Sequence, residues 1–134
     1  MIECKNLTKS YGDLTAVKNF CFHLKEKEFI SILGPSGCGK STLLRLIAGL
    51  DIPTSGEILL YNQEISGEKI KLPPENRKFG MIFQDFTLFP HLKVKENISF
   101  GINGTKKEKI KRVEELLDLV KLSHLSDKMP HQIS

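Results

Sequence analysis

The residues best suited to chemistry lie in one stretch, Gly34 to Thr42, which reads Gly-Pro-Ser-Gly-Cys-Gly-Lys-Ser-Thr. It matches the pattern G-x-x-x-x-G-K-[ST], in which glycines let the backbone approach a phosphate closely and successive N–H groups form an anion-binding nest. In this pattern Lys40 brings a full positive charge to the β- and γ-phosphates, and the Ser41 hydroxyl can hold Mg²⁺. The stretch therefore predicts a binding site for a nucleoside triphosphate.

A phosphate-binding loop of this kind needs a strand before it and a helix after it, and the sequence predicts both. The apolar run 29–33 predicts a buried strand, and the apolar residues after the loop predict a helix that ends near Gly49, a good C-cap residue. Further strands are predicted at residues 2–7, 17–24, 57–61 and 79–83. The chain mixes strands and helices as an α/β protein does, but early antiparallel strands that lead into one buried strand and then a helix are not a simple alternating β/α pattern.

The second half of the chain is predicted to be mainly helical. Residues 62–77 are polar, contain two adjacent prolines and predict a loop. Thr105 and Glu108 have the spacing of a capping box, and apolar residues recur after them at helical intervals. Helices are predicted at residues 94–102 and 106–121, with a short helical turn at 123–127.

The composition is that of a globular protein with a buried core. The chain has 134 residues, 40% hydrophobic and 27% charged, which suits one domain. It shows no apolar run of membrane-spanning length and no N-terminal signal pattern, so we expect a soluble, cytosolic chain that reaches a membrane only through a partner. Much of the net charge of +4 lies in one stretch without interleaved aromatics, namely Lys106, Lys107, Lys109, Lys111 and Arg112. This predicts a solvated helix face rather than a nucleic-acid surface.

The three cysteines are far apart, and no histidine lies near them in metal-ligand spacing. A zinc site and a disulfide framework are therefore not predicted. Cys4 and Cys21 are predicted to be small buried hydrophobic residues. Cys38 lies within the phosphate-binding loop, so we expect a thiol-alkylating reagent to block nucleotide binding and bound nucleotide to protect it.

A phosphate-loop NTPase usually needs a second acidic residue, at the end of a hydrophobic strand, to position Mg²⁺. Asp118 lies within a helical pattern and is a poor candidate. Asp85 follows the run 79–83, and if it supplies this carboxylate the protein is a compact phosphate-loop NTPase or kinase. A nucleic-acid-binding module built on the basic helix is a further alternative.

Four segments, in this order, make the sequence closely resemble the ATP-binding subunit of ABC transporters: Leu-Thr-Lys-Ser-Tyr-Gly at 7–12, the loop at 34–42, Pro-Thr-Ser-Gly-Glu-Ile at 53–58 and Gly-Met-Ile-Phe-Gln-Asp at 80–85. The segments at 73–77 and 88–92 look most like import subunits for ferric iron, polyamines, sulfate or sugars. The resemblance implies one ABC-type ATP-binding domain over residues 1–134. Its nucleotide-binding part, 1–85, would hold an antiparallel β subdomain and an incomplete RecA-like core, and 86–134 would begin the helical subdomain.

The resemblance also implies roles for individual residues. Tyr11 would stack on adenine, and Val17 would lie beside the nucleotide. Lys40 and Gln84 would be the catalytic residues, with Gln84 and Ser41 at Mg²⁺, so that Asp85 is not the Mg²⁺ carboxylate. The whole loop would contact ATP, namely Gly34, Pro35, Ser36, Gly37, Cys38, Gly39, Lys40, Ser41 and Thr42.

Ile133 and Ser134 resemble the start of the family's Leu-Ser-Gly-Gly-Gln signature, so Ser134 would contact ATP held by an opposite subunit. The family's aspartate-bearing strand, catalytic glutamate and switch histidine come later in its sequences. We therefore expect this chain to be an N-terminal portion that binds nucleotide weakly without turnover and leaves some apolar surface exposed.

For the complete protein, the resemblance implies ATP hydrolysis coupled to import at the cytoplasmic face of the inner membrane. Its partners would be transmembrane permease subunits, which the aromatic residues of 86–92 would help to receive, a second ATP-binding subunit and an extracytoplasmic substrate-binding protein. A non-transport ABC protein that acts in translation or repair is the alternative within the family.

Overall fold

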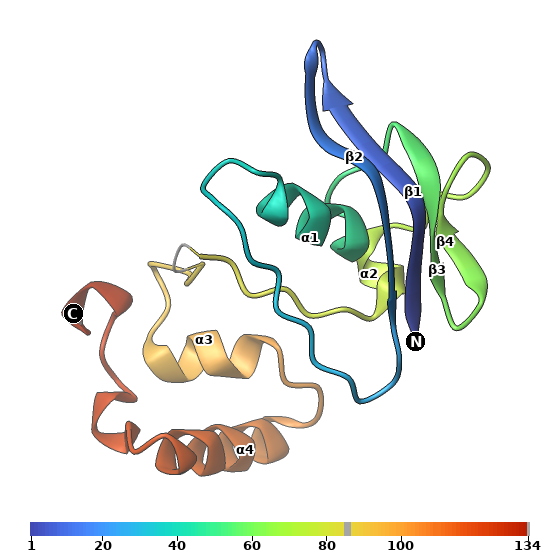
Figure 1. Ribbon diagram of the computed structural model, residues 1–134. Coiled ribbons are helices and arrows are strands. Elements are labelled where there is room, and N and C mark those ends of the chain that lie inside the picture. Colours follow the sequence, from blue (N-terminus) through green and yellow to red (C-terminus); the bar gives the residue numbers. More distant parts are fainter. Residues whose placement is uncertain (85–86, 134) are drawn as a thin grey trace. The chain divides into compact units, whose positions relative to one another are not determined.

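A computed structural model of the protein describes residues 1–84 and 87–133 (Figure 1). The chain divides into two compact units, Met1–Ile82 and Phe83–Ser134. The first unit contains a β-sheet and the phosphate-binding loop with its helix, and the second is helical.

The first unit is built on a four-stranded antiparallel sheet with the strand order β2-β1-β3-β4. Its strands are β1 (Ile2–Tyr11), β2 (Leu14–Leu24), β3 (Ser55–Leu60) and β4 (Gln63–Ser66). The three strands predicted at 2–7, 17–24 and 57–61 are thus confirmed, the first two being longer than predicted. Cys4 on the central strand pairs with Phe22 on one side and Ile58 on the other, so apolar residues of three strands meet on one face.

The helix α1 (Lys40–Ala48) follows the phosphate-binding loop and covers this face of the sheet. Its buried residues Leu43 and Leu46 pack with the sheet residues Cys4, Leu7 and Ile58. It ends at Gly49, whose φ of 81° is left-handed, as the sequence predicts. The core of the first unit therefore holds the start of α1 at one fixed place on the sheet.

The segment 62–77, predicted to be a loop, contains a short strand and a short helix, which corrects that prediction. A tight turn at Tyr61 and Asn62, with φ values of 50° and 63°, leads into β4. The short helix α2 (Pro74–Arg77) begins with a proline at its first position. It carries Arg77, only 3% exposed, which donates hydrogen bonds to carbonyls at the end of α1.

The predicted buried strands at 29–33 and 79–83 do not form. Neither run pairs with a strand in the part of the chain that the structure describes. Phe29 is 92% exposed, Leu33 87% and Ile82 99%, in agreement with the expected exposure of apolar surface. A buried parallel strand depends on neighbouring strands for its backbone hydrogen bonds, and an apolar run alone does not supply them.

Cys21 is exposed, so its predicted burial is wrong, whereas Cys4 is buried as predicted. The alternation along β2 explains the difference, because Phe20 and Phe22 pack against the core and Cys21 lies between them. On this outer side of the strand, the Cys21 sulfur accepts a hydrogen bond from the backbone N–H of Asn6 at 3.1 Å.

The second unit contains α3 (Val94–Phe100), α4 (Lys106–Leu119) and the short 3₁₀ turns Ser123–Leu125 and Pro130–Gln132. The predicted helices are confirmed, as is the capping box, in which the Thr105 N–H donates to Glu108 Oε2 at 2.7 Å. Val113 and Leu117 form the buried side of α4. Within residues 1–84 and 87–133, no helix combines the length and apolar character needed to cross a membrane.

Candidate functional site

The loop before α1 has the backbone conformation that a phosphate-binding nest requires. Gly34, Gly37 and Gly39 all have positive φ values, of 156°, 80° and 92°. Gly39 is the N-cap of α1, and no side chain caps it, nor does an acidic residue lie in the first turn of the helix. The first N–H groups of α1 lack intrahelical acceptors, so the helix offers these donors and the positive end of its dipole to an anion.

Gly39 is also the point where the loop touches the sheet. A Cβ atom on this residue would lie 2.1 Å from the backbone oxygen of Ala16 and 3.5 Å from Cγ2 of Val17. Any side chain here would push the loop away from β2, so only glycine fits. This close approach brings Val17, which is 8% exposed, next to the loop. Its predicted place beside the nucleotide stays a prediction.

The side chain of Lys40 lies across the loop. Its ammonium donates hydrogen bonds to the carbonyl oxygens of Gly34 at 2.9 Å and Pro35 at 2.6 Å, and contacts the Cys38 sulfur at 3.6 Å. The two carbonyls fix the charge over the nest, and the proton near the weakly accepting sulfur can be donated to a phosphate oxygen instead. The arrangement suits the binding of a polyphosphate chain.

A cavity of about 240 Å³ lies beside this loop. Its lining comes from β2, the run before the loop and the start of α1, and consists of Ala16, Val17, Lys18, Phe20, Ile32, Leu33, Cys38, Gly39, Lys40 and Leu43. Residues 34–38 and Ser41 are exposed. A ligand can therefore reach the loop from solvent, with only part of its surface in the cavity.

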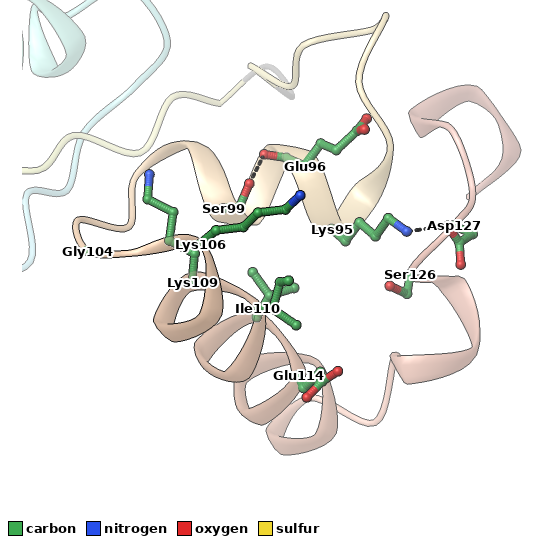
Figure 2. A pocket seen from close by; sticks show the side chains of 11 residues that line it. Lys95, Glu96, Ser99, Gly104, Lys106, Lys109, Ile110, Glu114, Ser126 and Asp127 are labelled. Carbon is green, nitrogen blue, oxygen red and sulfur yellow. Dashed lines mark hydrogen bonds and ion pairs between the residues drawn. The ribbon is translucent and has the colours of Figure 1, made fainter.

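A larger groove, of about 770 Å³, lies in the second unit between α3, α4 and the segment at Ser126 and Asp127 (Figure 2). Its lining includes three lysines and three acidic residues, and Lys95 forms an ion pair with Asp127 at 2.6 Å. These charges balance one another, and the lining lacks a glycine-rich nest at a helix N-terminus. The phosphate-binding features are therefore those of the first unit.

Tyr11, predicted to stack on adenine, ends β1 and is 47% exposed as a residue. Its hydroxyl donates a hydrogen bond to Asp51, and the ammonium of Lys9 lies 4.7 Å from the centre of its ring. The hydrogen bond to Asp51 raises the pKa of Tyr11, while Lys9 and the side chain of Thr42 lower it by smaller amounts.

Asp51 is a residue of this region that the sequence analysis did not identify. Its surroundings are partly desolvated, which raises its pKa, but hydrogen bonds from Lys9, Tyr11 and the N–H of Ile52 outweigh this and lower the pKa to about 2. The available signal was the shared face of Lys9 and Tyr11, two residues apart on a strand. No local pattern in the segment 51–56 points to β1.

Two of the remaining predicted site residues lie in the first turn of α1, where Thr42 is half-buried and Ser41 is exposed. Gln84 is exposed and belongs to the second unit, so its predicted approach to Mg²⁺ and water stays a prediction. Asp85 and Ser134 lie outside the described residues.

Comparison with known proteins gives a consistent result. Residues 17–134 match the protein family described as ABC transporter. The chain is 45% identical over 136 residues to the spermidine/putrescine import ATP-binding protein PotA of Roseobacter denitrificans, covering 99% of this chain and 36% of that protein. It is 42% identical over 136 residues to the maltose/maltodextrin import ATP-binding protein MalK of Escherichia coli (strain K12), with the same coverage of 99% and 36%. The chain thus spans about 36% of the length of these curated relatives.

Solved structures show the same likeness. A dimeric ATP-binding cassette in a post-hydrolysis state, bound to ADP and Pi, superposes with a TM-score of 0.85 at 37% identity, covering all 100% of this chain and 63% of that one. A dimeric bacterial ABC transporter cassette gives a TM-score of 0.84 at 38% identity, with the same coverage of 100% and 63%. The fold class predicted from the sequence is confirmed by these structures.

Proposed function

The chain belongs to the ABC transporter family, and on that premise we propose that it binds ATP as part of the ATP-binding component of an import system. The observation that carries this proposal is the uncapped N-terminus of α1, preceded by a loop with three positive-φ glycines and covered by the Lys40 ammonium. This donor set fits a triphosphate, which needs several N–H groups and a cation along one surface.

In the proposed complex, backbone N–H groups of residues 34–42 and the Lys40 ammonium hold the β- and γ-phosphates, and Thr42 lies on the α-phosphate side. Tyr11 stacks on adenine, with Val17 beside the nucleotide. The Ser41 hydroxyl is an oxygen ligand of the kind that Mg²⁺ prefers, with Gln84 as a further ligand. Bound Mg²⁺ neutralises charge on the phosphates, which lowers the cost of bringing further negative charge to them.

The hydrogen bonds that Lys40 makes within the loop support the catalytic role proposed for it. Because two loop carbonyls hold its ammonium, the charge is already in place when the phosphates arrive and needs little reorganisation. Lys40 then stabilises negative charge that develops during cleavage of the terminal phosphate, and Gln84 orients the attacking water. Replacing Lys40 would therefore weaken ATP binding and remove the contribution of its charge to hydrolysis.

For the complete protein we propose coupling of this ATPase to import, with transmembrane permease subunits, a second ATP-binding subunit and an extracytoplasmic substrate-binding protein as partners. The names of the relatives, which are import ATP-binding proteins, support this. The dimeric state of the similar cassettes supports the paired ATP-binding subunits. Such a subunit would work at the cytoplasmic face of the inner membrane.

Calorimetric titration of the chain with MgATP tests the proposed binding. We expect Lys40→Ala to lose at least tenfold in affinity, since a charge-assisted contact to phosphate is worth about 1.5–3 kcal/mol. Lys111→Ala removes a lysine charge from the exposed side of α4 and is the matched control. Equal affinity of wild type, Lys40→Ala and Lys111→Ala would show that ATP does not bind at the loop.

A further inference from the structure

Lys9, Tyr11 and Asp51 form a cluster of contacts that phosphate binding does not use. Lys9 and Tyr11 lie on the same face of β1, and Asp51 lies just after α1 and its C-cap. The carboxylate of Asp51 accepts hydrogen bonds on both oxygens, from the Tyr11 hydroxyl on one and from the Lys9 ammonium at 2.7 Å on the other. The two side chains of the ion pair are only 13% and 18% exposed.

Several backbone contacts hold this cluster in place. The Ile52 N–H donates to Asp51 Oδ1 at 2.7 Å, and the Lys9 ammonium donates to the Ile52 carbonyl at 2.8 Å. The Thr54 N–H donates to the Thr8 carbonyl at 2.8 Å. The segment that leaves α1 is therefore joined to β1, and the rotamer of Asp51 is fixed before any ligand binds.

The two faces of the Tyr11 ring have different surroundings. The Lys9 ammonium lies 4.7 Å from the ring centre, within the range of a cation–π contact, so it takes one face of the ring. The residue as a whole is 47% exposed, so the opposite face of the ring is available to solvent and to a base. A planar base can then stack from one side only.

We propose that Asp51 and Lys9 are positioning residues for the adenine base. Asp51 holds the Tyr11 hydroxyl and Lys9 supports one ring face, so that the opposite face is presented to adenine. Because Asp51 follows the helix that begins at the phosphate-binding loop, the base platform and the phosphate cradle keep a fixed relation. This proposal rests on the proposed function, in which Tyr11 stacks on adenine.

The test compares ATP with inorganic tripolyphosphate, which has the phosphates but no base. Affinities of both ligands are measured by calorimetry for wild type, Asp51→Asn, Tyr11→Phe and the double variant. Since fixing a mobile side chain in advance favours binding modestly, we expect each single variant to lose about three- to tenfold in ATP affinity and to bind tripolyphosphate unchanged. The double variant should be no weaker than Tyr11→Phe alone, because without the Tyr11 hydroxyl the residue at position 51 has no hydrogen bond to the ring to lose. Asp13→Asn, in the exposed turn of the same hairpin, is the matched control.

A second readout reports on Tyr11 directly. The chain has two tyrosines and no tryptophan, so in a Tyr61→Phe background the ultraviolet absorbance change at alkaline pH belongs to Tyr11 alone. The hydrogen bond to Asp51 is the main cause that raises the pKa of Tyr11. Asp51→Asn should therefore move this titration to lower pH, which a general loss of stability would not do.

The outcomes separate the inference from the proposed function. Unchanged ATP affinity in Asp51→Asn, or an equal loss for ATP and tripolyphosphate, would overturn the positioning role. If Asp51→Asn does not fold, Tyr11→Phe decides, since it keeps the exposed ring and removes only the hydroxyl. Wild type that binds tripolyphosphate as tightly as ATP would overturn the base contact but leave the phosphate site intact. If wild type binds neither ligand, the proposed function fails, and the inference with it.

Discussion

Replacing Arg77 with methionine should destabilise the first unit by about 2–3 kcal/mol. The guanidinium is 3% exposed and donates three hydrogen bonds, to the carbonyls of Leu72 at 2.7 Å, Leu46 at 2.8 Å and Ile47 at 3.0 Å. Two of these carbonyls are among the last of α1, which have no partners within the helix. Burial lowers the pKa of Arg77, but an arginine stays charged at neutral pH, so a cation sits at the negative end of the helix dipole.

The magnitude follows from these contacts. Three hydrogen bonds from a charged donor, at about 1.5 kcal/mol each, amount to about 4.5 kcal/mol. A buried methionine recovers about 1.5–2 kcal/mol of this through its apolar surface. In the Arg77→Met variant the Leu46 carbonyl would still accept a hydrogen bond from the Gly49 N–H, which is 3.2 Å away, and this further limits the loss of stability. Arg77→Lys should lose less stability than Arg77→Met, because the positive charge remains. It should still be less stable than wild type, because an ammonium cannot reproduce the planar guanidinium geometry.

Tyrosine fluorescence during urea unfolding is the suitable assay, because both tyrosines of the chain, Tyr11 and Tyr61, lie in the first unit and the chain has no tryptophan. Arg45→Met is the matched control, since Arg45 is an exposed arginine on the same helix. We expect it to change the free energy of unfolding by less than about 0.5 kcal/mol.

Gly49 offers a coupled test of the same contact. A Cβ atom at this position would lie 2.5 Å from Nε of Arg77, so the penalty of Gly49→Ala should shrink in the Arg77→Met background. An Arg77→Met variant no less stable than Arg45→Met, or strictly additive effects with Gly49→Ala, would refute this account of the end of α1.

Three further predictions concern other parts of the molecule. The Asn97 side chain exchanges four hydrogen bonds with the backbone of residues 89–93, so Asn97→Ala should destabilise the second unit by about 2 kcal/mol in a thermal melt followed by circular dichroism. Asp51, with a pKa lowered from 3.8 to about 2, should stabilise the fold fully above about pH 4 and lose this effect as the pH falls toward 2; Asp51→Asn should flatten that part of the pH–stability curve. Cys21 and Cys38 are exposed and should react with an alkylating reagent, whereas Cys4, buried and with a pKa raised to about 12, should not; bound ATP should protect Cys38 alone, as seen by peptide mass spectrometry.

Each of these predictions can fail in a definite way. An Asn97→Ala variant as stable as wild type would show that the loop at 89–93 is held by other contacts. The same acid dependence in wild type and Asp51→Asn would remove Asp51 as a source of that dependence. Full alkylation at Cys38 with unchanged ATP affinity would place the nucleotide away from the thiol.

Local patterns in the sequence predicted those elements that are stabilised by near neighbours. The helix α1 (Lys40–Ala48) and the capping box at Thr105 depend on residues close in the chain and were predicted correctly. The two strands of the β1–β2 hairpin were also predicted, but both are longer than expected. The short strand β4 was missed because only four residues form it and three of them are polar.

Elements that depend on distant partners were not predictable in the same way. The apolar run 29–33 looks like a buried strand, yet a strand forms only where neighbouring strands pair with it, and Phe29 is 92% exposed. The phosphate-binding loop was identified because its function fixes both residue types and spacing. The contact of Asp51 with Tyr11 spans 40 positions and has no such signature, so it became visible only in the folded structure.

The central claim is that this chain binds a nucleoside triphosphate at the loop before α1. It is tested most directly by titrating ¹⁵N-labelled protein with MgATP and following the backbone amide signals by NMR. The account predicts saturable shifts of the amides of the loop 34–42 and of Tyr11, no shifts along α4, and in Lys40→Ala a loop response that needs at least tenfold more MgATP. Shifts that are confined to the lysines of α4, or that persist unchanged in Lys40→Ala, would contradict it.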